Sequence, residues 1–288
     1  MPAVTPTSLV CSVRGCGRPL EPAGRALACA AGHSFDIARA GYVNLTQPQD
    51  RRSLEAGDRP EAVEARDQLL TQGVGQHIVQ QVTREAESLA LPSTGLVVDL
   101  GAGTGALLAS ICTAGRHPVA PASRAALHGI GIDLSVQAME LAARRHPSLT
   151  WVVANADRRL PVGDGCATLV VSMHGRRNPS ECARVLANGG MLFVIVPGVH
   201  DLRELRTAVG GRWVAQDRVP GVLAEHTEHF RHVRRITMEE RHRVDRATVR
   251  QLLRATYRGE RRSAAATIDT IDTLDVTLSS DLLVFEKG

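Results

Sequence analysis

Short apolar runs alternate with segments of helical pattern between residues 95 and 197. The runs are LVVDL (96–100), GIGID (129–133), TWVVANA (150–156), ATLVVSM (167–173) and GMLFVIVP (190–197). Runs that are apolar throughout are typical of parallel strands buried on both faces. The segments between them, such as 135–145 and 180–188, carry apolar residues at helical spacing. The pattern therefore predicts a doubly wound α/β domain, with helices on both faces of a parallel sheet.

The flanking segments follow other patterns. Pro60 at a first helical position predicts a helix that ends at Gly73, and residues 76–90 predict a second helix. Near the end of the chain, 232–244 favours a strand and 247–257 a helix. The stretch 273–287 predicts two strands joined near Ser279 and Ser280, as a hairpin at the sheet edge.

Four residues near the start have the spacing of a metal site. Cys11, Cys16, Cys29 and His33 form the pattern C-x4-C followed by C-x3-H. These spacings fall within those of structural zinc sites, and four protein ligands leave no open position for catalysis. A segment this short buries little apolar surface, so a metal would supply its folding energy. We expect loss of a ligand, as in Cys29→Ser, to unfold this module and leave cofactor binding largely intact.

These patterns divide the chain into three regions. We expect a zinc-binding module over 1–45, a linker with helices over 46–92, and the α/β domain over 93–288. The linker prediction rests on the polar stretch 46–60, which is rich in residues that break helices and strands.

Composition and charge narrow the class of protein. The 288 residues are 43% hydrophobic and 22% charged, which excludes a disordered or fibrous chain. No apolar run approaches the ~20 residues of a membrane helix, and the first ten residues lack a signal-peptide pattern, so we expect a cytoplasmic protein.

Lys287 is the only lysine, and the other basic residues are arginines. Residues 231–262 hold eleven arginines against four carboxylates, a surplus of seven that favours phosphate binding. We expect these arginines to bind RNA phosphates together with Arg14, Arg18 and Arg25 of the zinc-binding module. The alternative is that carboxylates on the same strand pair with these arginines.

A glycine-rich turn follows the first predicted strand of the domain. It comprises Gly101, Gly103, Thr104 and Gly105, and Asp99 precedes it at the strand end. The glycines alone also fit a dinucleotide fingerprint. A carboxylate at position 99 would repel a pyrophosphate, but it suits the ammonium and sulfonium groups of S-adenosylmethionine (SAM). The glycine turn therefore favours SAM.

Two further acids follow the next two strands. Asp133 is placed to accept hydrogen bonds from ribose hydroxyls, and Asp157 from an adenine amino group. Asp133 lies 28 residues past Gly105, which is farther than the ~20 residues of dinucleotide folds. We therefore expect a SAM site made by the glycine turn with Asp99, Asp133 and Asp157.

Together these motifs resemble the 23S rRNA guanine-N1 methyltransferases, a family that includes self-resistance enzymes of macrolide producers. The matching pieces are the four metal-ligand candidates, His33–Leu45, Ala56–Asp58, Asp99–Gly105, Arg177–Pro179, Arg184–Leu186, Gly189–Gly190, Pro197 and Asp275–Ser279. The resemblance implies a zinc-ribbon RNA-recognition module on a SAM-dependent methyltransferase domain. It also implies a homodimer, and a 23S rRNA hairpin near the macrolide site as target.

Methylation at guanine N1 requires a group that accepts the N1 proton. His174, His200 and Asp201 are candidates, because all three are predicted at the carboxyl edge of the sheet. The catalytic assignment stays open among them. Two other functions stay open as well, a small-molecule SAM methyltransferase and a non-catalytic zinc-containing RNA-binding protein.

Overall fold

The computed structural model describes residues 8–47, 57–89, 91–92, 94–114, 127–210, 214–256 and 268–288. The strands within these ranges are β1 (Glu21–Ala23), β2 (Ala26–Ala28), β3 (Ser34–Asp36), β4 (Tyr42–Asn44), β5 (Leu96–Leu100), β6 (His128–Asp133), β7 (Thr150–Val153), β8 (Ala167–Met173), β9 (Leu186–Pro197), β10 (Phe230–Asp245) and β11 (Thr273–Lys287). The helices are α1 (Pro60–Thr71), α2 (Gln76–Ser88), α3 (Ala106–Thr113), α4 (Val136–Arg145), α5 (Pro179–Val185), α6 (Arg203–Gly210), α7 (Val219–His226) and α8 (Arg246–Ala255). Most of the predicted linker, residues 48–56, lies outside the described residues.

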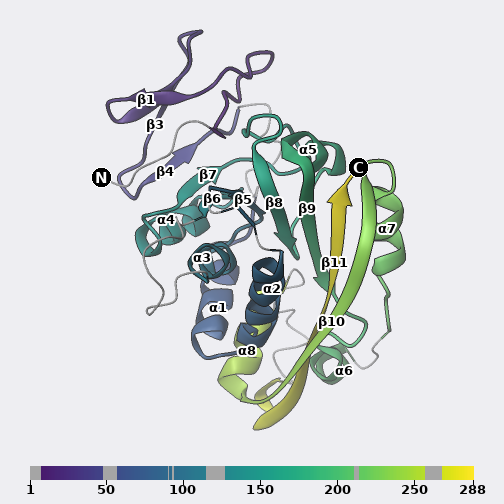
Figure 1. The fold of residues 1–288 in the computed structure, drawn as a ribbon. Coiled ribbons are helices and arrows are strands. Elements are labelled where there is room, and N and C mark those ends of the chain that lie inside the picture. Colours follow the sequence, from purple (N-terminus) through teal and green to yellow (C-terminus); the bar gives the residue numbers. More distant parts are fainter. Residues whose placement is uncertain are drawn as a thin grey trace, which may run out of the picture.

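One large sheet organises the molecule (Figure 1). Its strand order is β10-β11-β9-β8-β5-β6-β7-β4. Strands β4 to β9 within it pair in parallel, whereas β11 runs antiparallel to both β9 and β10. The five apolar runs of the sequence correspond to β5, β6, β7, β8 and β9, which confirms the predicted α/β class.

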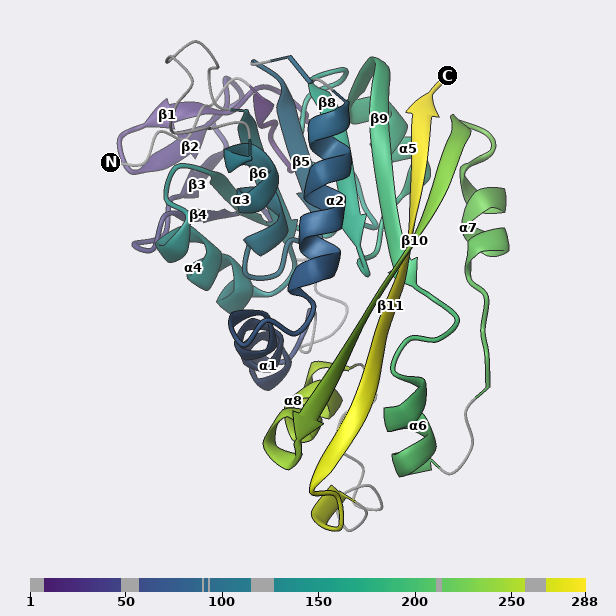
Figure 2. The same ribbon diagram turned by 60° about the horizontal axis from the view of Figure 1, so that its bottom comes forward.

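Each face of this sheet has its own apolar core. Helices α2, α3 and α4 cover one face, where Leu108, Met139 and Trp151 are buried (Figure 2). Residues of α5 and α7 pack on the opposite face. No helix occurs in 154–166, between β7 and β8, so this part of the second face depends on another cover.

The N-terminal module provides that cover. Leu9 forms a bridge with Val162, and the Val10 amide donates to the Pro161 carbonyl at 3.0 Å. Buried side chains of the module, including Leu9 and Leu27, belong to the same apolar cluster as residues of β5, β6 and β8. The module and the sheet therefore share one core. This shared core favours a different outcome for the loss of a zinc ligand from unfolding of the module alone, because the apolar side chains of the module cover one face of the sheet.

Residues 42–44, which the division of the sequence placed with the module, join the large sheet. They form β4, which pairs in parallel with β7 at the edge of the sheet. The Leu45 amide continues the pairing by donating to the Val153 carbonyl at 2.9 Å. The chain thus passes from the module into the α/β domain through a shared strand.

The prediction of a hairpin within 273–287 is wrong. These residues form the single strand β11, which pairs with β10 along its length. Ser279 and Ser280, which suggested a turn, are 1% and 0% exposed. Their hydroxyls are hydrogen bonded inside the protein, so these polar residues do not need the solvent of a turn. The hairpin is formed instead by β10 and β11, with α8 in the connection.

Candidate functional site

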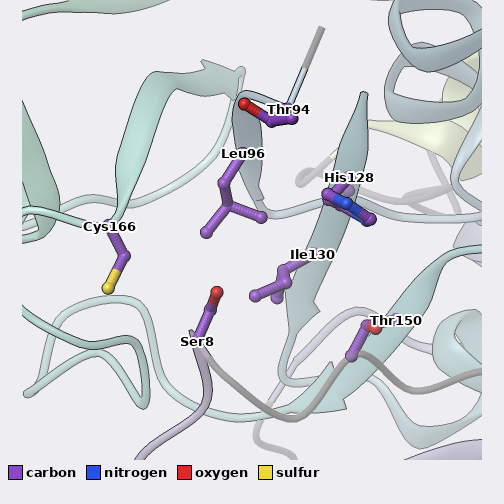
Figure 3. A pocket seen from close by; sticks show the side chains of 8 residues that line it. Ser8, Thr94, Leu96, His128, Ile130, Thr150 and Cys166 are labelled. Carbon is purple, nitrogen blue, oxygen red and sulfur yellow. The ribbon is translucent and has the colours of Figure 1, made fainter. Parts of the chain in front are cut away.

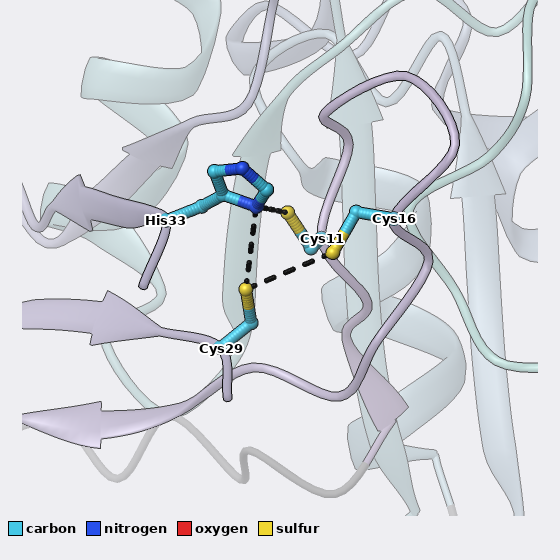
Figure 4. Close-up of side chains that lie close together, drawn as sticks. All are labelled: Cys11, Cys16, Cys29 and His33. Carbon is cyan, nitrogen blue, oxygen red and sulfur yellow. Dashed lines mark hydrogen bonds between the residues drawn. The ribbon is translucent and has the colours of Figure 1, made fainter. Parts of the chain in front are cut away.

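The four predicted metal ligands converge on one point (Figure 4). The Nδ1 atom of His33 lies 3.4 Å from Cys11 Sγ and 3.5 Å from Cys29 Sγ, and the sulfurs of Cys16 and Cys29 are 3.8 Å apart. Zinc bonds of ~2.3 Å to sulfur and ~2.0–2.1 Å to nitrogen, arranged as a tetrahedron, give edges of ~3.8 Å and ~3.5 Å. The observed separations match those edges, so the cluster fits a tetrahedral zinc ion.

The thiols of this cluster differ in acidity. Burial raises the pKa of Cys11 to about 12. Burial also acts to raise the pKa of Cys29, but hydrogen bonds from the following turn and from Cys16 and His33 outweigh it and lower the pKa to about 6. Metal binding requires all three cysteines as thiolates, and it therefore releases protons.

The glycine turn connects β5 to α3 at the carboxyl edge of the sheet. Gly101, Gly103 and Gly105 have φ angles of 76°, 54° and 84°, in the left-handed region that favours glycine. A Cβ on Gly103 would meet nothing within 4 Å. A Cβ on Gly101 would lie 3.2 Å from Gly175 Cα. Open space next to the turn thus lies beside Gly103.

Asp99 is buried at the end of β5, with 2% of its surface exposed. Its Oδ2 atom is buried and has no hydrogen-bond partner within the described part of the chain. Burial, followed by the charge of Asp133, raises the pKa of Asp99 to about 7. A buried carboxylate oxygen without a partner is costly. A cation at this place would offset the cost, so Asp99 fits the ammonium group of SAM.

Asp133 ends the neighbouring strand and holds the turn in place. Its Oδ2 accepts from the Gly103 amide at 3.0 Å and its Oδ1 from the Ser135 amide at 2.8 Å. Burial raises the pKa of Asp133, although these two hydrogen bonds act in the opposite direction. The structure therefore brings Asp99, Asp133 and the three glycines to one edge.

The other two predicted cofactor residues already have protein partners. Thr104 is 8% exposed and forms a hydrogen bond with Asp67 of α1, which lowers the pKa of Asp67 after the larger effect of Arg145. Asp157 lies after β7 and pairs with Arg176 at 3.0 Å. Both residues stand at the carboxyl edge, with side chains engaged by neighbouring elements.

Sequence reasoning missed the part of Trp151 in this turn. A Cβ on Gly105 would lie 2.3 Å from the Trp151 ring, and one on Gly131 would lie 2.2 Å from it. Trp151 comes from β7 and is 1% exposed. Gly105 is therefore required by the packing of an indole as well as by its φ angle. No local signal links these residues, because they meet only through the sheet.

Residues 57 and 58, which belong to the matching piece Ala56–Asp58 of the family resemblance, reach the same edge of the sheet. Gly57 packs against the turn that follows β6, where its Cβ would lie 2.9 Å from the Ser135 amide nitrogen. The next residue, Asp58, pairs with Arg66 of α1. The Asp58 and Arg66 charges both act on the pKa of Asp133. This segment thus places charged groups beside the predicted ribose position, whereas Ala56 lies outside the described residues.

The three candidates for the N1 proton follow β8 and β9. His174 comes directly after β8, and its Nε2 lies 3.0 Å from Ser280 Oγ. Asp201 Oδ1 accepts from the Ser279 amide at 3.3 Å, and its Oδ2 pairs with Arg206 at 3.2 Å. Residues 279 and 280 are neighbours on β11, so His174 and Asp201 contact adjacent positions of one strand. His200 precedes Asp201 in the same turn.

A cavity of about 250 Å³ lies elsewhere (Figure 3). Leu96, His128 and Thr150 line it, and they are the first residues of β5, β6 and β7. These positions mark the amino edge of the sheet, opposite the glycine turn. The cavity is therefore separate from the predicted cofactor site.

The arginines of β10 and α8 are largely neutralised. Arg231 pairs with Glu286, Arg234 with Glu85, Arg235 with Asp281, Arg246 with Asp272 and Arg250 with Asp269. Most of these carboxylates come from other elements, which the local count of charges could not include. The surplus at 231–262 is thus smaller in the folded protein than along the sequence, and residues 257–262 lie outside the described residues.

The arginines of the N-terminal module, in contrast, are not paired with carboxylates in the described part of the chain. Arg14, Arg18, Arg25 and Arg39 are exposed, and none has a carboxylate partner in the ranges that the structure describes. A Cβ on Gly17 would lie 3.0 Å from an Arg159 guanidinium nitrogen, so this arginine of the α/β domain adjoins the module.

Comparisons with known proteins agree with both parts of the chain. A zinc-ribbon family model described as RlmA, N-terminal, matches residues 10–54, and one described as Methyltransferase domain matches residues 97–190. A 23S rRNA (guanine(748)-N(1))-methyltransferase of Streptomyces fradiae is 36% identical over 217 residues, which cover 75% of this chain and 73% of the relative.

Two further relatives carry related names. One from Micromonospora griseorubida, named provisionally as a 23S rRNA (guanine-N(1)-)-methyltransferase, is 34% identical over 83% of this chain and 82% of its own length. Another from Bacillus subtilis, with the same provisional name, is 34% identical over 64% of this chain and 62% of its own length. Identity of this extent, across both the zinc module and the methyltransferase domain, shows that the chain belongs to the family of the 23S rRNA guanine-N1 methyltransferases.

Proposed function

We propose that this protein transfers a methyl group from SAM to N1 of a guanine in 23S rRNA. The observation that carries the SAM part is the buried, unpartnered Oδ2 of Asp99 beside the open side of Gly103. Asp99 would face the ammonium group, Asp133 the ribose hydroxyls and Asp157 the adenine amino group. Gly101, Gly103, Thr104 and Gly105 would form the turn around the cofactor. Bound SAM supplies an electrophilic methyl group on a sulfonium.

The zinc cluster has a structural part in this proposal. Cys11, Cys16, Cys29 and His33 would fill all four positions of a tetrahedral ion, so no substrate could bind the metal. The ion would hold the module in the shape that covers the sheet and presents its arginines.

The exposed arginines of the module are our proposed contact with RNA phosphates. Guanidinium groups bind phosphate at two points, and Arg14 and Arg18 have no competing carboxylate among the described residues. Arg159 would extend this surface onto the α/β domain. The paired arginines of β10 would contribute less, because each phosphate contact would first have to break an ion pair.

Finer points of the function follow from the relatives alone. The name of the S. fradiae protein supports a guanine of the 748 type as the target. The family resemblance is what supports a hairpin near the macrolide site. We propose on the family resemblance that the enzyme is a cytoplasmic homodimer and that the modification confers antibiotic self-resistance. No helix among the described residues is long and apolar enough to span a membrane.

The decisive experiment is methyl transfer from labelled SAM to a 23S rRNA hairpin transcript. A methyl group on N1 blocks Watson–Crick pairing, so reverse transcription should stop one nucleotide before the modified guanine. The same assay with a metabolite pool tests for a small-molecule methyltransferase. RNA binding without any transfer would favour the non-catalytic alternative, and either result would overturn the proposal.

A further inference from the structure

Two residues other than glycine have φ angles in the left-handed region within the described ranges. They are His174, with φ of 55°, and Leu202, with φ of 51°. Such backbone costs roughly 1–3 kcal/mol at each position and persists only where the surroundings fix it. His174 follows β8 and Leu202 follows the turn after β9. The two positions thus follow β8, the neighbour of β5, and β9, the next strand along, on the edge that carries the glycine turn.

Both strained positions contact β11 at buried polar residues, all at most 2% exposed: Thr277, Ser279 and Asp281 on one face of the strand and Ser280 on the other. The Leu202 amide donates to the Thr277 carbonyl at 2.7 Å. Ser280 Oγ contacts the imidazole of His174, and the Ser279 amide donates to the carboxylate of Asp201. Buried polar groups destabilise a core unless they are hydrogen bonded. Here their hydrogen bonds hold the turn after β8 and the turn after β9.

The hydrogen bond of Ser280 selects a tautomer of His174. Ser280 is 0% exposed, and its hydroxyl has the His174 ring as its side-chain partner. A buried hydroxyl hydrogen needs an acceptor; where Ser280 Oγ donates, Nε2 of His174 accepts and the ring proton resides on Nδ1. His174 as a residue keeps an exposed side. A proton on Nδ1 is the one left to donate to a substrate.

The turn of His174 also contacts the glycine turn. A Cβ on Gly175 would lie 2.7 Å from the Leu100 carbonyl oxygen and 3.5 Å from Gly101 Cα. Only a residue without a side chain fits between these backbones. The imidazole is therefore carried by a segment that packs directly on the proposed cofactor loop.

The surroundings lower the pKa of His174 and raise the pKa of Asp201. Burial of the imidazole, followed by the charges of Arg218 and Arg66, lowers the pKa of His174 to about 4. Burial raises the pKa of Asp201 to about 6, against the Ser279 hydrogen bond and the charges of Arg206 and Arg218. At pH 7 the imidazole is neutral and the carboxyl is ionised. Groups pushed apart in this way are suited to different tasks in one reaction.

We propose that Asp201 accepts the N1 proton of the target guanine, and that His174, held by Ser280, donates a hydrogen bond from Nδ1 to guanine O6. This inference rests on the proposed function. The N1–H bond breaks and its proton passes to Asp201, while the charge left on N1 and O6 is stabilised by His174. N1 then forms its bond to the methyl carbon, and the sulfur–carbon bond breaks with its electrons remaining on sulfur. Ser280 acts through His174 and is a positioning residue.

The first test compares two buried serines. Ser280→Ala should lower the single-turnover rate about tenfold, the loss expected for one hydrogen bond, and Ser280→Thr should restore it because the hydroxyl remains. Ser172→Ala is the matched control, since Ser172 is also 0% exposed but its Oγ has no partner in the described structure. Affinity for S-adenosylhomocysteine should stay unchanged in all three variants. Equal losses in Ser280→Ala and Ser172→Ala would overturn the positioning role.

The second test uses the pH profile. The wild-type rate should rise with pH as Asp201 ionises around pH 6 and then level off. Asp201→Asn keeps the shape of the side chain, and at pH 7 it should lower the rate by about 10²–10⁴-fold. Its rate should recover at alkaline pH, where N1 loses its proton without help, and Asp201→Glu should retain part of the activity at pH 7.

The outcomes separate the two proposals. A wild type that methylates the hairpin, together with an Asp201→Asn variant that keeps the wild-type profile, would overturn the assignment of Asp201 alone. A wild type without methyl transfer to RNA would overturn the proposed function, and this inference with it.

Discussion

Removal of zinc should destabilise the whole protein rather than its first 45 residues. The perturbation is Cys29→Ser, which removes one of four converging ligands. Leu9, Leu20 and Leu27 of the module are each 0% exposed and belong to a cluster shared with the sheet. Without the ion, the loops that hold these side chains against the sheet lose their fixed geometry.

The size of the effect follows from this burial. Burying a leucine side chain stabilises a protein by roughly 1.5–3 kcal/mol, so the three leucines contribute about 5–9 kcal/mol. This is an upper estimate, because the unfolded chain already buries part of its apolar surface. It is comparable with the whole stability of a natural domain, about 5–15 kcal/mol. At about 2–4 °C per kcal/mol, a loss of 5 kcal/mol should lower Tm by about 10 °C or more.

Scanning calorimetry of zinc-loaded and variant protein measures this effect. We expect one cooperative transition that shifts as a whole, together with loss of SAM binding at temperatures where the wild type still binds. Cys166→Ser is the control, because Cys166 is a free cysteine outside the cluster. Two separate transitions, of which only the lower one moves in Cys29→Ser, would refute the idea of a shared core.

Three further predictions concern the cofactor and the RNA. Asp99→Asn should weaken SAM binding about tenfold or more in calorimetry, since a hydrogen bond to a charged group contributes roughly 1.5–3 kcal/mol. Because the pKa of Asp99 is raised to about 7, the carboxylate forms as pH rises, so wild-type affinity should increase from pH 6 to 8 and the variant should lose this dependence. Gly105→Ala should prevent folding by its clash with Trp151, whereas Gly103→Ala, which meets no atom within 4 Å, should stay folded and lose SAM affinity; equal thermal stability of the two would contradict this. Changing the exposed module arginines to alanine should lower the salt slope of RNA binding by roughly 0.7–0.9 per lost phosphate contact, and an unchanged slope would place the RNA elsewhere.

Short-range patterns in the sequence were sufficient for much of the fold. The strand that ends at Leu100, the strand that ends at Asp133 and the helix that begins at Pro60 all appear as predicted. The periodicity of a helix, and the burial of a strand on both faces, can be seen in the pattern of apolar residues over a short stretch of sequence. The four candidate zinc ligands were visible for the same reason, since each pair stands within a short local segment.

Only the tertiary structure showed which side chains of these elements contact one another. The stretch around Ser280 suggested a turn, because its polar residues have partners that are distant in the chain; His174 is 106 residues away. The need for a glycine at position 105 is explained by the Trp151 ring, which would clash with a Cβ there. This contact arises only when the sheet places β7 two strands from β5. The arginines of β10 looked like a basic surface until carboxylates from other elements neutralised them.

The N-terminal module shows the same limit most clearly. Its ligands could be identified in the sequence, but not its place as the cover of a sheet face that lacks a crossover helix. A sequence records the preference of each segment to be buried, and it does not record which surface will bury it. That choice is made by the packing of the complete chain, and here it placed the N-terminal module and the large sheet in one apolar core.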